Sequence, residues 1–540
     1  IRAHLEAENA HVEAFMAPTT DLQAALVAEM RGRIKEDDAS VPQPDGPFAY
    51  GVRHREGGQH PLIFRTPRAG GPETILLDGD AMAAGYAYFS LRGTRHSPDH
   101  RLMAYGVDDK GSEYYTVRIR DLSSGADLSD VLPETGGSVA WAADAKSLFY
   151  VWLDENHRPS KVYHHVIGTP READRVVYEE ADAGFFVGLS VTQSGRFILI
   201  EAHDHETSEV WAIDATDPTA PLRLIAGRVT GEEVSVDHAV IAGQDHFVIL
   251  TNADGAEDFK IVTAPVATPD RAHWTDLVPH VPGRLILSHG VLAGALLRLE
   301  RLEGLPRIVI KPLDDGEERL IAFAEEAYAL GLSLGYEFDT TTIRFTYSSM
   351  TTPSQMFDYD IATGERTLRK TQVVPSGHDP DDYITRRVMA PASDGELVPV
   401  SLLYHRSTPI DGSAPLLLYG YGAYGITIPA GFSTNALSLV NRGFVYAIAH
   451  IRGGKDKGYR WYRLGKREHK PNTFTDFIAA AEHLIKAGFA HPDRIVAQGG
   501  SAGGMLMGAI TNMRPDLFAG IIAEVPFVDV LATMVDATLP

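Results

Sequence analysis

The sequence has 540 residues, of which 44% are hydrophobic and 22% charged, and this balance excludes collagen-like, coiled-coil and wholly disordered classes of protein. It contains no cysteine, so disulfides, thiolate nucleophiles and cysteine-ligated metals are excluded. The 72 acidic and 49 basic residues give a net charge of −23, and no apolar run reaches about 18 residues, so we expect neither a nucleic-acid partner nor a membrane partner.

Residues 1–41 are expected to form a helical segment. Residues 2–16 mix acidic residues and histidines with apolar ones, and they lack the apolar core of a targeting signal. Leu5, Val12 and Phe15 predict that this stretch is an amphipathic helix. The absence of a signal favours a cytoplasmic location, with the periplasm as the alternative.

Residues 42–378 are rich in short β-forming runs broken by turn-forming pairs. Units that join a turn to a β-rich run recur at spacings of 44, 51, 50, 51 and 44 residues; they begin at positions 97, 141, 192, 242, 293 and 337. A period of about 40–50 residues with four strands per unit is typical of propeller blades. With one further unit at 47–80, the sequence predicts a seven-bladed β-propeller. A large β-sandwich is the alternative.

The chain changes character at about residue 379, where apolar runs begin to alternate with helical patterns. The predicted strands are 415–419, 443–451, 494–498 and 520–525, and the predicted helices are 473–487 and 502–512. This order predicts a doubly wound, mostly parallel sheet with helices on both faces over residues 379–540. Thr473 and Asp476 are predicted to cap the first helix, and Gly488 is predicted to end it.

A G-x-S-x-G motif at 499–503 carries the predicted chemistry. The pattern is short, and a second copy at 331–335, around Ser333, lies in the β-rich region. The first copy follows the strand 494–498 and opens a helix, which is the strand–turn–helix context that a serine nucleophile needs. The N-terminus of that helix also presents backbone N–H groups to an oxyanion. We therefore interpret Ser501 as a nucleophile and Ser333 as a structural residue.

Three other patterns are interpreted as structural. Residues 420–425 fit G-x-G-x-x-G after a strand, but no helix follows and residues 438–448 contain no acidic residue, so a dinucleotide site is rejected. The histidines at 203–206 and 164–165 have no third ligand at helical spacing, and we interpret them as polar turn residues at the surface. We expect no metal and no organic cofactor.

Seven segments along the chain form a pattern that is more specific than any single motif. They include LLLYGYGAYG and GGSAGGMLMG, and they lie at 5–15, 30–42, 416–425, 443–454, 458–485, 499–508 and 514–540. Together they resemble the prolyl oligopeptidase family of serine peptidases, and within it the oligopeptidase B subfamily. The resemblance implies an α/β-hydrolase domain built from both ends of the chain, residues 1–41 and 379–540. It also implies that residues 42–378 form a seven-bladed β-propeller that covers this domain.

The resemblance assigns roles to five residues. Ser501 matches the nucleophile. Tyr421 matches a tyrosine whose hydroxyl helps to form the oxyanion hole, and the backbone N–H of Ala502 is the second donor. A phenol at the end of strand 415–419 suits this role, because it can point at a carbonyl oxygen above the same edge of the sheet. Tyr424 and Phe527 match residues that line the pocket for the side chain before the scissile bond.

The sequence departs from the family pattern in two respects. Only 540 − 501 = 39 residues follow Ser501. Because the order in α/β hydrolases is Ser, Asp, His, we expect the triad aspartate and histidine to lie outside this chain. The C-terminal part of the hydrolase domain is then absent or held as a separate piece, and the chain alone is expected to be inactive. The second departure concerns the stretches ITIPAGF and RGGKDKG, which contain Pro429 and Lys455 where the subfamily has acidic or glycine residues.

These observations predict a serine oligopeptidase that hydrolyses short peptides by acyl transfer. Cleavage after arginine or lysine is the leading specificity by resemblance, and a negative net charge suits short basic peptides. The alternative within the family is cleavage after proline. The alternative from another class is a non-catalytic binding module that uses the propeller face.

Overall fold

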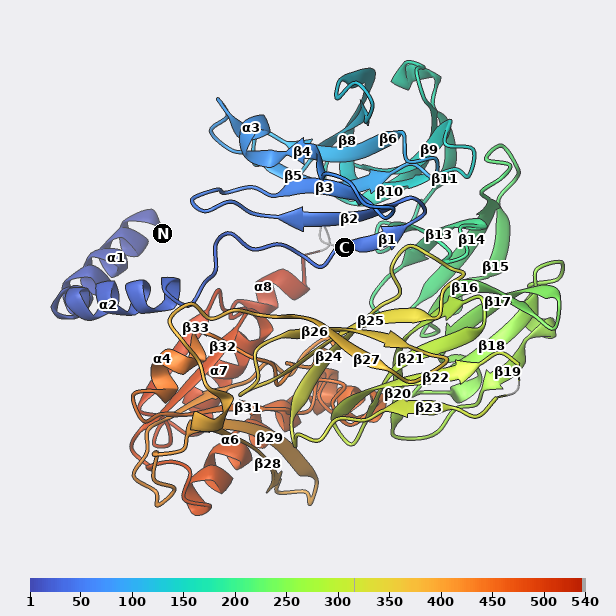
Figure 1. Cartoon of the computed structure of the whole chain (residues 1–540). Helices are drawn as coiled ribbons and strands as arrows, with labels where there is room; N and C mark the ends of the chain where they lie inside the picture. Colours follow the sequence, from blue (N-terminus) through green and yellow to red (C-terminus); the bar gives the residue numbers. More distant parts are fainter. Residues whose placement is uncertain (315, 537–540) are drawn as a thin grey trace.

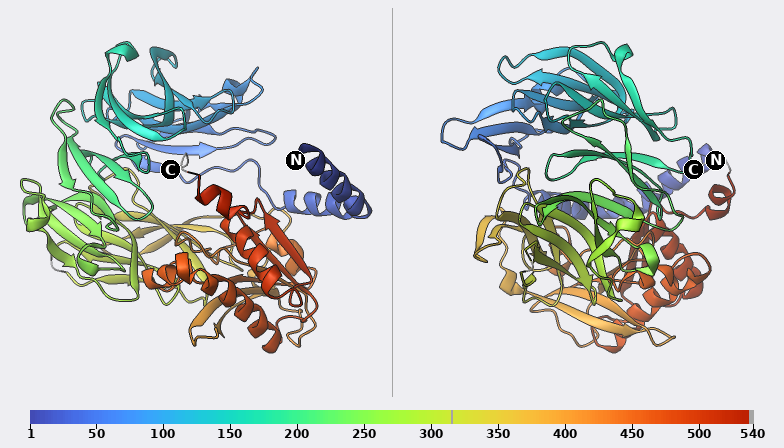
Figure 2. Two further views of the ribbon diagram at one scale, coloured as in Figure 1. Left: turned by 180° about the vertical axis from the view of Figure 1, so that it is seen from behind. Right: turned by 90° about the vertical axis from the view of Figure 1, so that its right-hand side faces the viewer.

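A computed structural model describes residues 1–314 and 316–536, and it divides into a β-rich part and a smaller α/β part (Figure 1). The first two helices lie beside the α/β part and not beside the sheets that directly follow them in sequence (Figures 1 and 2). They are α1 (Arg2–Met16) and α2 (Thr20–Arg31), joined by a 3-10 turn at Ala17–Thr19. No helix among the described residues is long and apolar enough to cross a membrane.

Polar contacts fix the end of α2 to the α/β part. Neither α1 nor α2 buries a side chain, so apolar packing does not hold them. Glu29 forms an ion pair with Arg442 at 2.8 Å, and the buried Arg33 donates to the hydroxyl of Ser438 at 2.5 Å. The two ends of the described chain therefore meet in one unit.

Among its described residues, the β-rich part contains 27 strands and one short α-helix, α3 (Gly79–Ala83). The strands are β1 (Gln43–Asp45), β2 (Phe48–Arg53), β3 (Leu62–Pro67), β4 (Thr74–Asp78), β5 (Ser90–His96), β6 (Leu102–Asp108), β7 (Tyr115–Asp121), β8 (Asp127–Trp141), β9 (Ser147–Leu153), β10 (Pro159–Val166), β11 (Arg175–Glu179), β12 (Phe186–Val191), β13 (Phe197–His203), β14 (Ser208–Asp214), β15 (Arg223–Ala226), β16 (Val234–Ile241), β17 (Gln244–Thr251), β18 (Lys260–Pro265), β19 (Thr275–Val278), β20 (Arg284–Leu292), β21 (Ala295–Leu302), β22 (Leu305–Pro312), β23 (Arg319–Ile321), β24 (Tyr328–Ser333), β25 (Thr342–Ser349), β26 (Gln355–Asp360) and β27 (Arg366–Thr371).

The number of separate blades differs from the prediction of seven. Five sheets have four strands each, β1–β4, β12–β15, β16–β19, β20–β23 and β24–β27, whereas β5–β11 form one seven-stranded sheet. The cause is the 15-residue strand β8. Its first half, to Thr135, pairs with β7, and its second half, from Thr135 to Trp141, pairs with β9. A register shift between Thr135 and Val139 lets one strand bend and serve both neighbours, so no gap separates them.

The α/β part is built on a six-stranded sheet in the order β28-β29-β31-β30-β32-β33. The strands are β28 (Tyr383–Pro391), β29 (Leu397–His405), β30 (Leu416–Tyr419), β31 (Val445–Ala449), β32 (Ile495–Gly500) and β33 (Gly520–Glu524). The pairs β30–β31, β30–β32 and β32–β33 are parallel, and the pairs β28–β29 and β29–β31 are antiparallel. The predicted order of elements after residue 379 is therefore present, with an antiparallel edge.

Helices cover both faces of this sheet: α6 (Pro471–Lys486) and α7 (Ala502–Met513) pack on one face, and α4 (Ala436–Val440) packs on the other. Two short helices, α5 (Tyr459–Arg463) and α8 (Val530–Met534), complete this part, and α8 buries no residue. Neighbouring residues of a strand point to opposite faces. Leu402 accordingly packs in the core beneath α6 and α7, and Leu403 packs with α4 on the other face. Ala327 and Met350, which flank strands of the last four-stranded sheet, share the cluster with α4. The β-rich part therefore docks on the α4 face.

The predicted start of helix α6 was wrong. The helix begins at Pro471, so Thr473 and Asp476 lie inside it and are buried. Thr473 donates to the carbonyl oxygen of Arg452 at 2.9 Å, and Asp476 forms a two-pronged ion pair with the Arg452 guanidinium. These side chains join the helix to the loop after β31 and do not cap it. The predicted end is confirmed, because Gly488 follows the helix with φ +81°.

The predicted domain boundaries fall between regular elements. Strand β1 begins at Gln43, 12 residues after the end of α2 at Arg31, and β27 ends at Thr371, before the 3-10 turn Pro380–Asp382. The predicted range 379–540 ends in residues 537–540, which lie outside the described residues.

Candidate active site

Ser501 stands at the turn between β32 and α7. Its backbone has φ +55° and ψ −115°, a conformation that costs a non-glycine residue about 1–3 kcal/mol. The turn is held on both sides, because the Ser501 N–H donates to the carbonyl oxygen of Glu524 at 2.9 Å and the Phe527 N–H donates to the Ser501 carbonyl oxygen at 3.0 Å. The Ser501 side chain is exposed. A strained turn therefore lifts the Ser501 hydroxyl above the sheet.

Glycines let the backbone pass closely around this turn. A Cβ at Gly499 would lie 2.5 Å from the carbonyl oxygen of Gly503 and 2.9 Å from that of Gly420. A Cβ at Gly504 would lie 2.5 Å from Pro526 Cα. Any larger side chain at these positions would separate α7 from its neighbours, and Ser501 would move with the helix.

Tyr421 follows β30 and reaches the same edge of the sheet. A hydrogen bond links its phenol to Ser501. Burial raises the pKa of Tyr421, and the Ser501 hydrogen bond only partly offsets this. The phenol therefore keeps its proton at neutral pH and can donate it to an oxyanion.

The loop that carries Tyr421 is tied to the body of the α/β part. Lys470 donates from Nζ to the carbonyl oxygen of Gly422 at 2.6 Å, and the N–H of Gly425 donates to the Gly453 carbonyl oxygen at 2.9 Å. Burial lowers the pKa of Lys470 to about 8. Lys470 was not among the predicted site residues, because its role depends on a contact with Gly422, which lies 48 residues away in sequence.

The N–H of Ala502 is the second predicted oxyanion donor. Ala502 is buried at the first position of α7, where the N–H has no intrahelical acceptor. No acceptor for it occurs among residues 1–314 and 316–536. Together with the Tyr421 phenol, it gives the site two hydrogen-bond donors near Ser501.

The two predicted pocket residues lie in different surroundings. Phe527 is half-buried, and the hydrogen bond from its N–H to the Ser501 carbonyl oxygen places it next to Ser501. Tyr424 is 57% exposed, with φ +56°, and its ring centroid lies 5.7 Å from that of His205 in the β-rich part. Tyr424 therefore stands at the junction of the two parts of the molecule.

A histidine near the core of the α/β part, His450, contacts residues other than Ser501. His450 hydrogen-bonds through Nε2 to the Ser401 hydroxyl at 2.8 Å, and its Nδ1 lies 3.1 Å from Asp456 Oδ1. All three side chains are at least nine-tenths buried. This serine–histidine–aspartate chain of contacts thus occupies His450 away from Ser501. The other motif serine, Ser333, ends strand β24 in the β-rich part.

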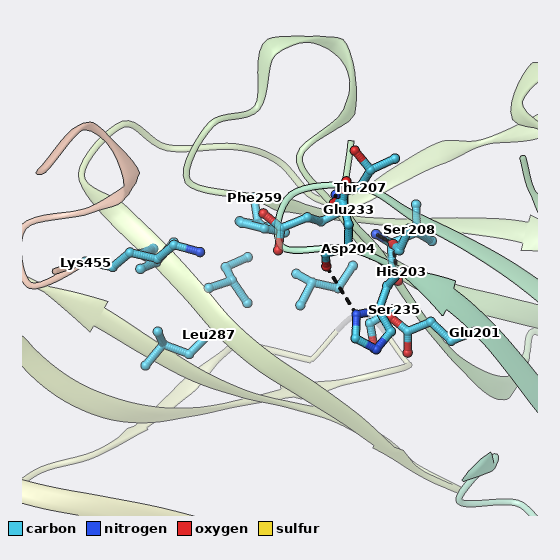
Figure 3. Close-up of a pocket in the computed structure, with 14 residues that line it drawn as sticks. Glu201, His203, Asp204, Thr207, Ser208, Glu233, Ser235, Phe259, Leu287 and Lys455 are labelled. Carbon is cyan, nitrogen blue, oxygen red and sulfur yellow. Dashed lines mark hydrogen bonds between the residues drawn. The ribbon is translucent and has the colours of Figure 1, made fainter. Parts of the chain in front are cut away.

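A cavity of about 230 Å³ lies where the β-rich part meets Lys455, in the loop after β31 (Figure 3). Glu201 and Glu233 line it from β-rich elements, and Lys455 extends toward them from the α/β part (Figure 3). Burial raises the pKa of both carboxyl groups. The stem of Lys455 packs against Gly425, so the cavity adjoins the loop that begins at Tyr421.

The structure corrects the interpretation of the two histidine clusters. His203 and Asp204 line this cavity, so they are not simple surface residues. His164 and His165 are buried in β10. His165 lies between Asp174 at 2.7 Å and Asp130 at 2.9 Å; burial opposes its charging, but these hydrogen bonds raise the pKa of His165. Its partners are strand and loop residues distant in sequence, which a search for helical spacing cannot find.

Comparison with known proteins assigns both parts of the chain. The family model "Prolyl oligopeptidase, N-terminal beta-propeller domain" matches residues 1–372, and the model "Prolyl oligopeptidase family" matches residues 430–540. Dipeptidyl aminopeptidase BI of Pseudoxanthomonas mexicana is 40% identical over 100% of this chain and 76% of its own length. Protease 2 of Moraxella lacunata is 33% identical over 99% of this chain and 78% of its own.

Solved structures agree with this assignment. Oligopeptidase B from Leishmania major superposes with a TM-score of 0.93 at 34% identity, covering 100% of this chain and 77% of its own. A closed form of oligopeptidase B from Trypanosoma brucei with covalently bound antipain gives a TM-score of 0.92 at 34% identity, covering 98% and 76%.

Proposed function

The chain belongs to the prolyl oligopeptidase family of serine peptidases, and we propose that Ser501 is the nucleophile with which it hydrolyses short peptides. The observation that supports this proposal is the strained turn at Ser501, with the Tyr421 phenol hydrogen-bonded to it. A serine with only a structural role would be expected in an unstrained conformation. The strained turn exposes the hydroxyl, which a nucleophile requires.

The proposed reaction is acyl transfer. Ser501 Oγ attacks the carbonyl carbon of the scissile bond, and a general base takes the hydroxyl proton. The Tyr421 phenol and the Ala502 N–H donate to the oxyanion that forms. The C–N bond then breaks, the base returns the proton to the leaving amine, and water releases the acyl group from Ser501 in a second step.

The proposed base is a histidine held by an aspartate, both outside the 540 residues. His450 is unsuited to the role, because its side chain is buried, its Nε2 is hydrogen-bonded to Ser401, and its Nδ1 faces Asp456. The relatives compared above extend beyond the region that they share with this chain. The C-terminal segment would then supply the base, either in the same polypeptide or as a separate piece.

We propose cleavage after arginine or lysine, with short basic peptides as substrates. Relatives of this chain include oligopeptidase B and protease 2. Glu201 and Glu233 place two carboxyl groups in the cavity beside the Tyr424 loop, and burial raises the pKa of both, so a basic side chain or an amine that entered the cavity would favour their ionised form. Tyr424 and Phe527 would line the pocket for the residue before the scissile bond. Cleavage after proline is the alternative that the test must separate.

We further propose that residues 42–378 act as a filter over the site. The sheets dock on the α4 face, and Tyr424 meets His205 at the junction, so a peptide must pass between the two parts to reach Ser501. Folded proteins would be excluded and short or unstructured peptides admitted.

The test uses paired fluorogenic substrates that end in arginine or in proline, each with a free and with a blocked amino terminus. The full gene product, checked by intact mass, is compared with Ser501→Ala and with Ser333→Ala, the matched change in the second G-x-S-x-G motif. Arginyl turnover that Ser501→Ala abolishes and Ser333→Ala retains is the expected result. Turnover of the prolyl substrate alone would refute the specificity. The absence of any turnover that depends on Ser501 would favour the non-catalytic binding module.

A further inference from the structure

Three potential metal ligands meet at the seam of the β-rich part, far from Ser501 in sequence. Asp45 ends strand β1, His96 ends strand β5, and His100 lies in the turn after β5. One ligand atom from each residue lies within 4.8 Å of the other two. His96 Nε2 is 2.6 Å from Asp45 Oδ2, so two of the three already touch. His96 is buried, and the other two residues are half-buried.

The backbone at His100 has a conformation that glycine adopts more easily than histidine. His100 has φ +61° in a turn closed by its N–H on the Ser97 carbonyl oxygen. The corresponding turns of later units place Ala145 (φ +56°) and Gly195 (φ +68°) at this position. The turn therefore accepts a residue other than glycine, and a glycine in place of His100 should fit it without strain.

Neighbouring aromatic residues hold the two imidazoles. The Tyr50 hydroxyl hydrogen-bonds to His100 Nδ1 at 2.9 Å, and this contact leaves Nε2 of His100 for another partner. The Tyr50 ring stacks on His96 with centroids 3.8 Å apart and planes within 1°. Tyr336, just before β25, meets the edge of His96 at 5.0 Å. Metal-binding histidines are commonly fixed through their second nitrogen in this way.

We propose that Asp45, His96 and His100 bind a divalent transition metal, with Zn²⁺ as the best fit. Two imidazoles and one carboxylate form a three-ligand set that leaves one position for water. Tetrahedral Zn²⁺ with ligands at about 2.1 Å needs ligand atoms about 3.4 Å apart, so His96 Nε2 and Asp45 Oδ2 must move apart from their present 2.6 Å. The hydrogen they share must leave or move to Nδ1 of His96.

The surroundings allow a metal ion to enter. Asp45 and His96 line an open cavity of about 630 Å³, which provides a path from solvent. Cationic side chains lie near the cluster: Arg65 donates to the His100 carbonyl oxygen at 2.7 Å, and Arg68 and Arg95 line the same cavity as Asp45 and His96. Arg68 is paired with Glu337 at 2.5 Å, so its charge is offset. Arg65 and Arg95 oppose the metal, and the Asp45 carboxylate partly offsets them. This site could not be predicted from the sequence, because 51 residues separate Asp45 from His96 and no helical spacing joins them.

A metal at this place would join separate sheets. Asp45 belongs to the sheet β1–β4, and the two histidines belong to the seven-stranded sheet. Strand β1 also contacts the last four-stranded sheet, because Arg344 of β25 donates to the Gln43 side chain at 2.7 Å. The ion would therefore stabilise the seam where the first sheet meets both its neighbours.

The test compares zinc binding by the purified, chelator-treated chain with that of two variants. His100→Gly removes one ligand and puts glycine at a positive φ, so the fold should be retained. His157→Gly is the matched control, because His157 also has a positive φ, +60°, and lies outside the cluster. Binding is measured by calorimetry and by competition with a zinc-sensitive dye, and thermal unfolding is recorded with and without zinc.

The expected result is one zinc ion per chain in the wild type and in His157→Gly, with a higher unfolding temperature when zinc is bound. His100→Gly should weaken this binding more than tenfold and lose the thermal shift. A wild-type chain without saturable zinc binding overturns the proposal, and so does zinc binding that His100→Gly leaves unchanged.

Discussion

Helix α7 carries two glycines in different surroundings, and they give a direct test of the packing around Ser501. A Cβ at Gly504 would lie 2.5 Å from Pro526 Cα, whereas a Cβ at Gly508 would meet nothing nearer than Val528 Cγ1, at 3.8 Å. Gly504→Ala should therefore push α7 away from the segment after β33, and Gly508→Ala should not.

Two opposing free-energy contributions decide whether each variant is more or less stable than the original chain. Replacing glycine by alanine inside a helix stabilises by about 0.5–1 kcal/mol. Overpacking against atoms that cannot move freely costs about 1–3 kcal/mol. Gly504→Ala should then be destabilising by about 1–2 kcal/mol, and Gly508→Ala should be neutral or stabilising by up to about 1 kcal/mol. Because the backbone of Pro526 cannot rotate out of the way as a side chain can, we expect the loss for Gly504→Ala to lie in the upper half of its range of about 1–2 kcal/mol.

The assay is unfolding in urea followed by circular dichroism, together with hydrogen exchange in the α7 peptide. Hydrogen exchange assigns the change to the helix, because a chain with two parts need not unfold in one step. Gly504→Ala should exchange faster in α7 and unfold at lower urea than Gly508→Ala. Equal stability of the two variants would show that α7 and the Pro526 segment are not in tight contact.

Three further predictions concern the same part of the molecule. Tyr421→Phe in the full gene product should lower kcat on the order of 10²-fold with little change in KM, as steady-state kinetics would show, and an unchanged kcat would remove Tyr421 from the oxyanion hole. Asp476→Ala should lower the free energy of unfolding by about 3 kcal/mol in urea titrations, because the buried Arg452 then keeps only Asp394 as an ion-pair partner, and a loss below about 1 kcal/mol would contradict this. Hydrogen bonding to Arg442 lowers the pKa of Glu29 from 4.5 to about 2, so the attachment of α2 should be complete above about pH 4.5 and lost as the pH falls toward 2. Proteolysis at α2 over this range should follow the loss, and Glu29→Gln should abolish its pH dependence.

The local sequence was sufficient to predict the elements around Ser501. The apolar run 494–498, the small residues after it and the periodic stretch that follows predict strand, turn and helix, and the structure has β32, Ser501 and α7 in that order. The same holds for α6, whose apolar residues recur at helical spacing. Each of these features depends on neighbours within a few residues, so a local pattern is enough to predict them.

The remaining features of the fold and the site depend on contacts between segments that are distant in sequence. Strand β8 contains a proline and two glycines that suggest a break, yet it pairs with both β7 and β9, because partners on each side satisfy its backbone. Asp476 resembles a cap in sequence, but the burial of Arg452 makes it an ion-pair partner. Asp45 meets His96 and His100 only because the sheets close on one another. The sequence by itself determined the strand–turn–helix at Ser501, whereas these three pairings depend on which surfaces pack together, and only the tertiary structure fixes that.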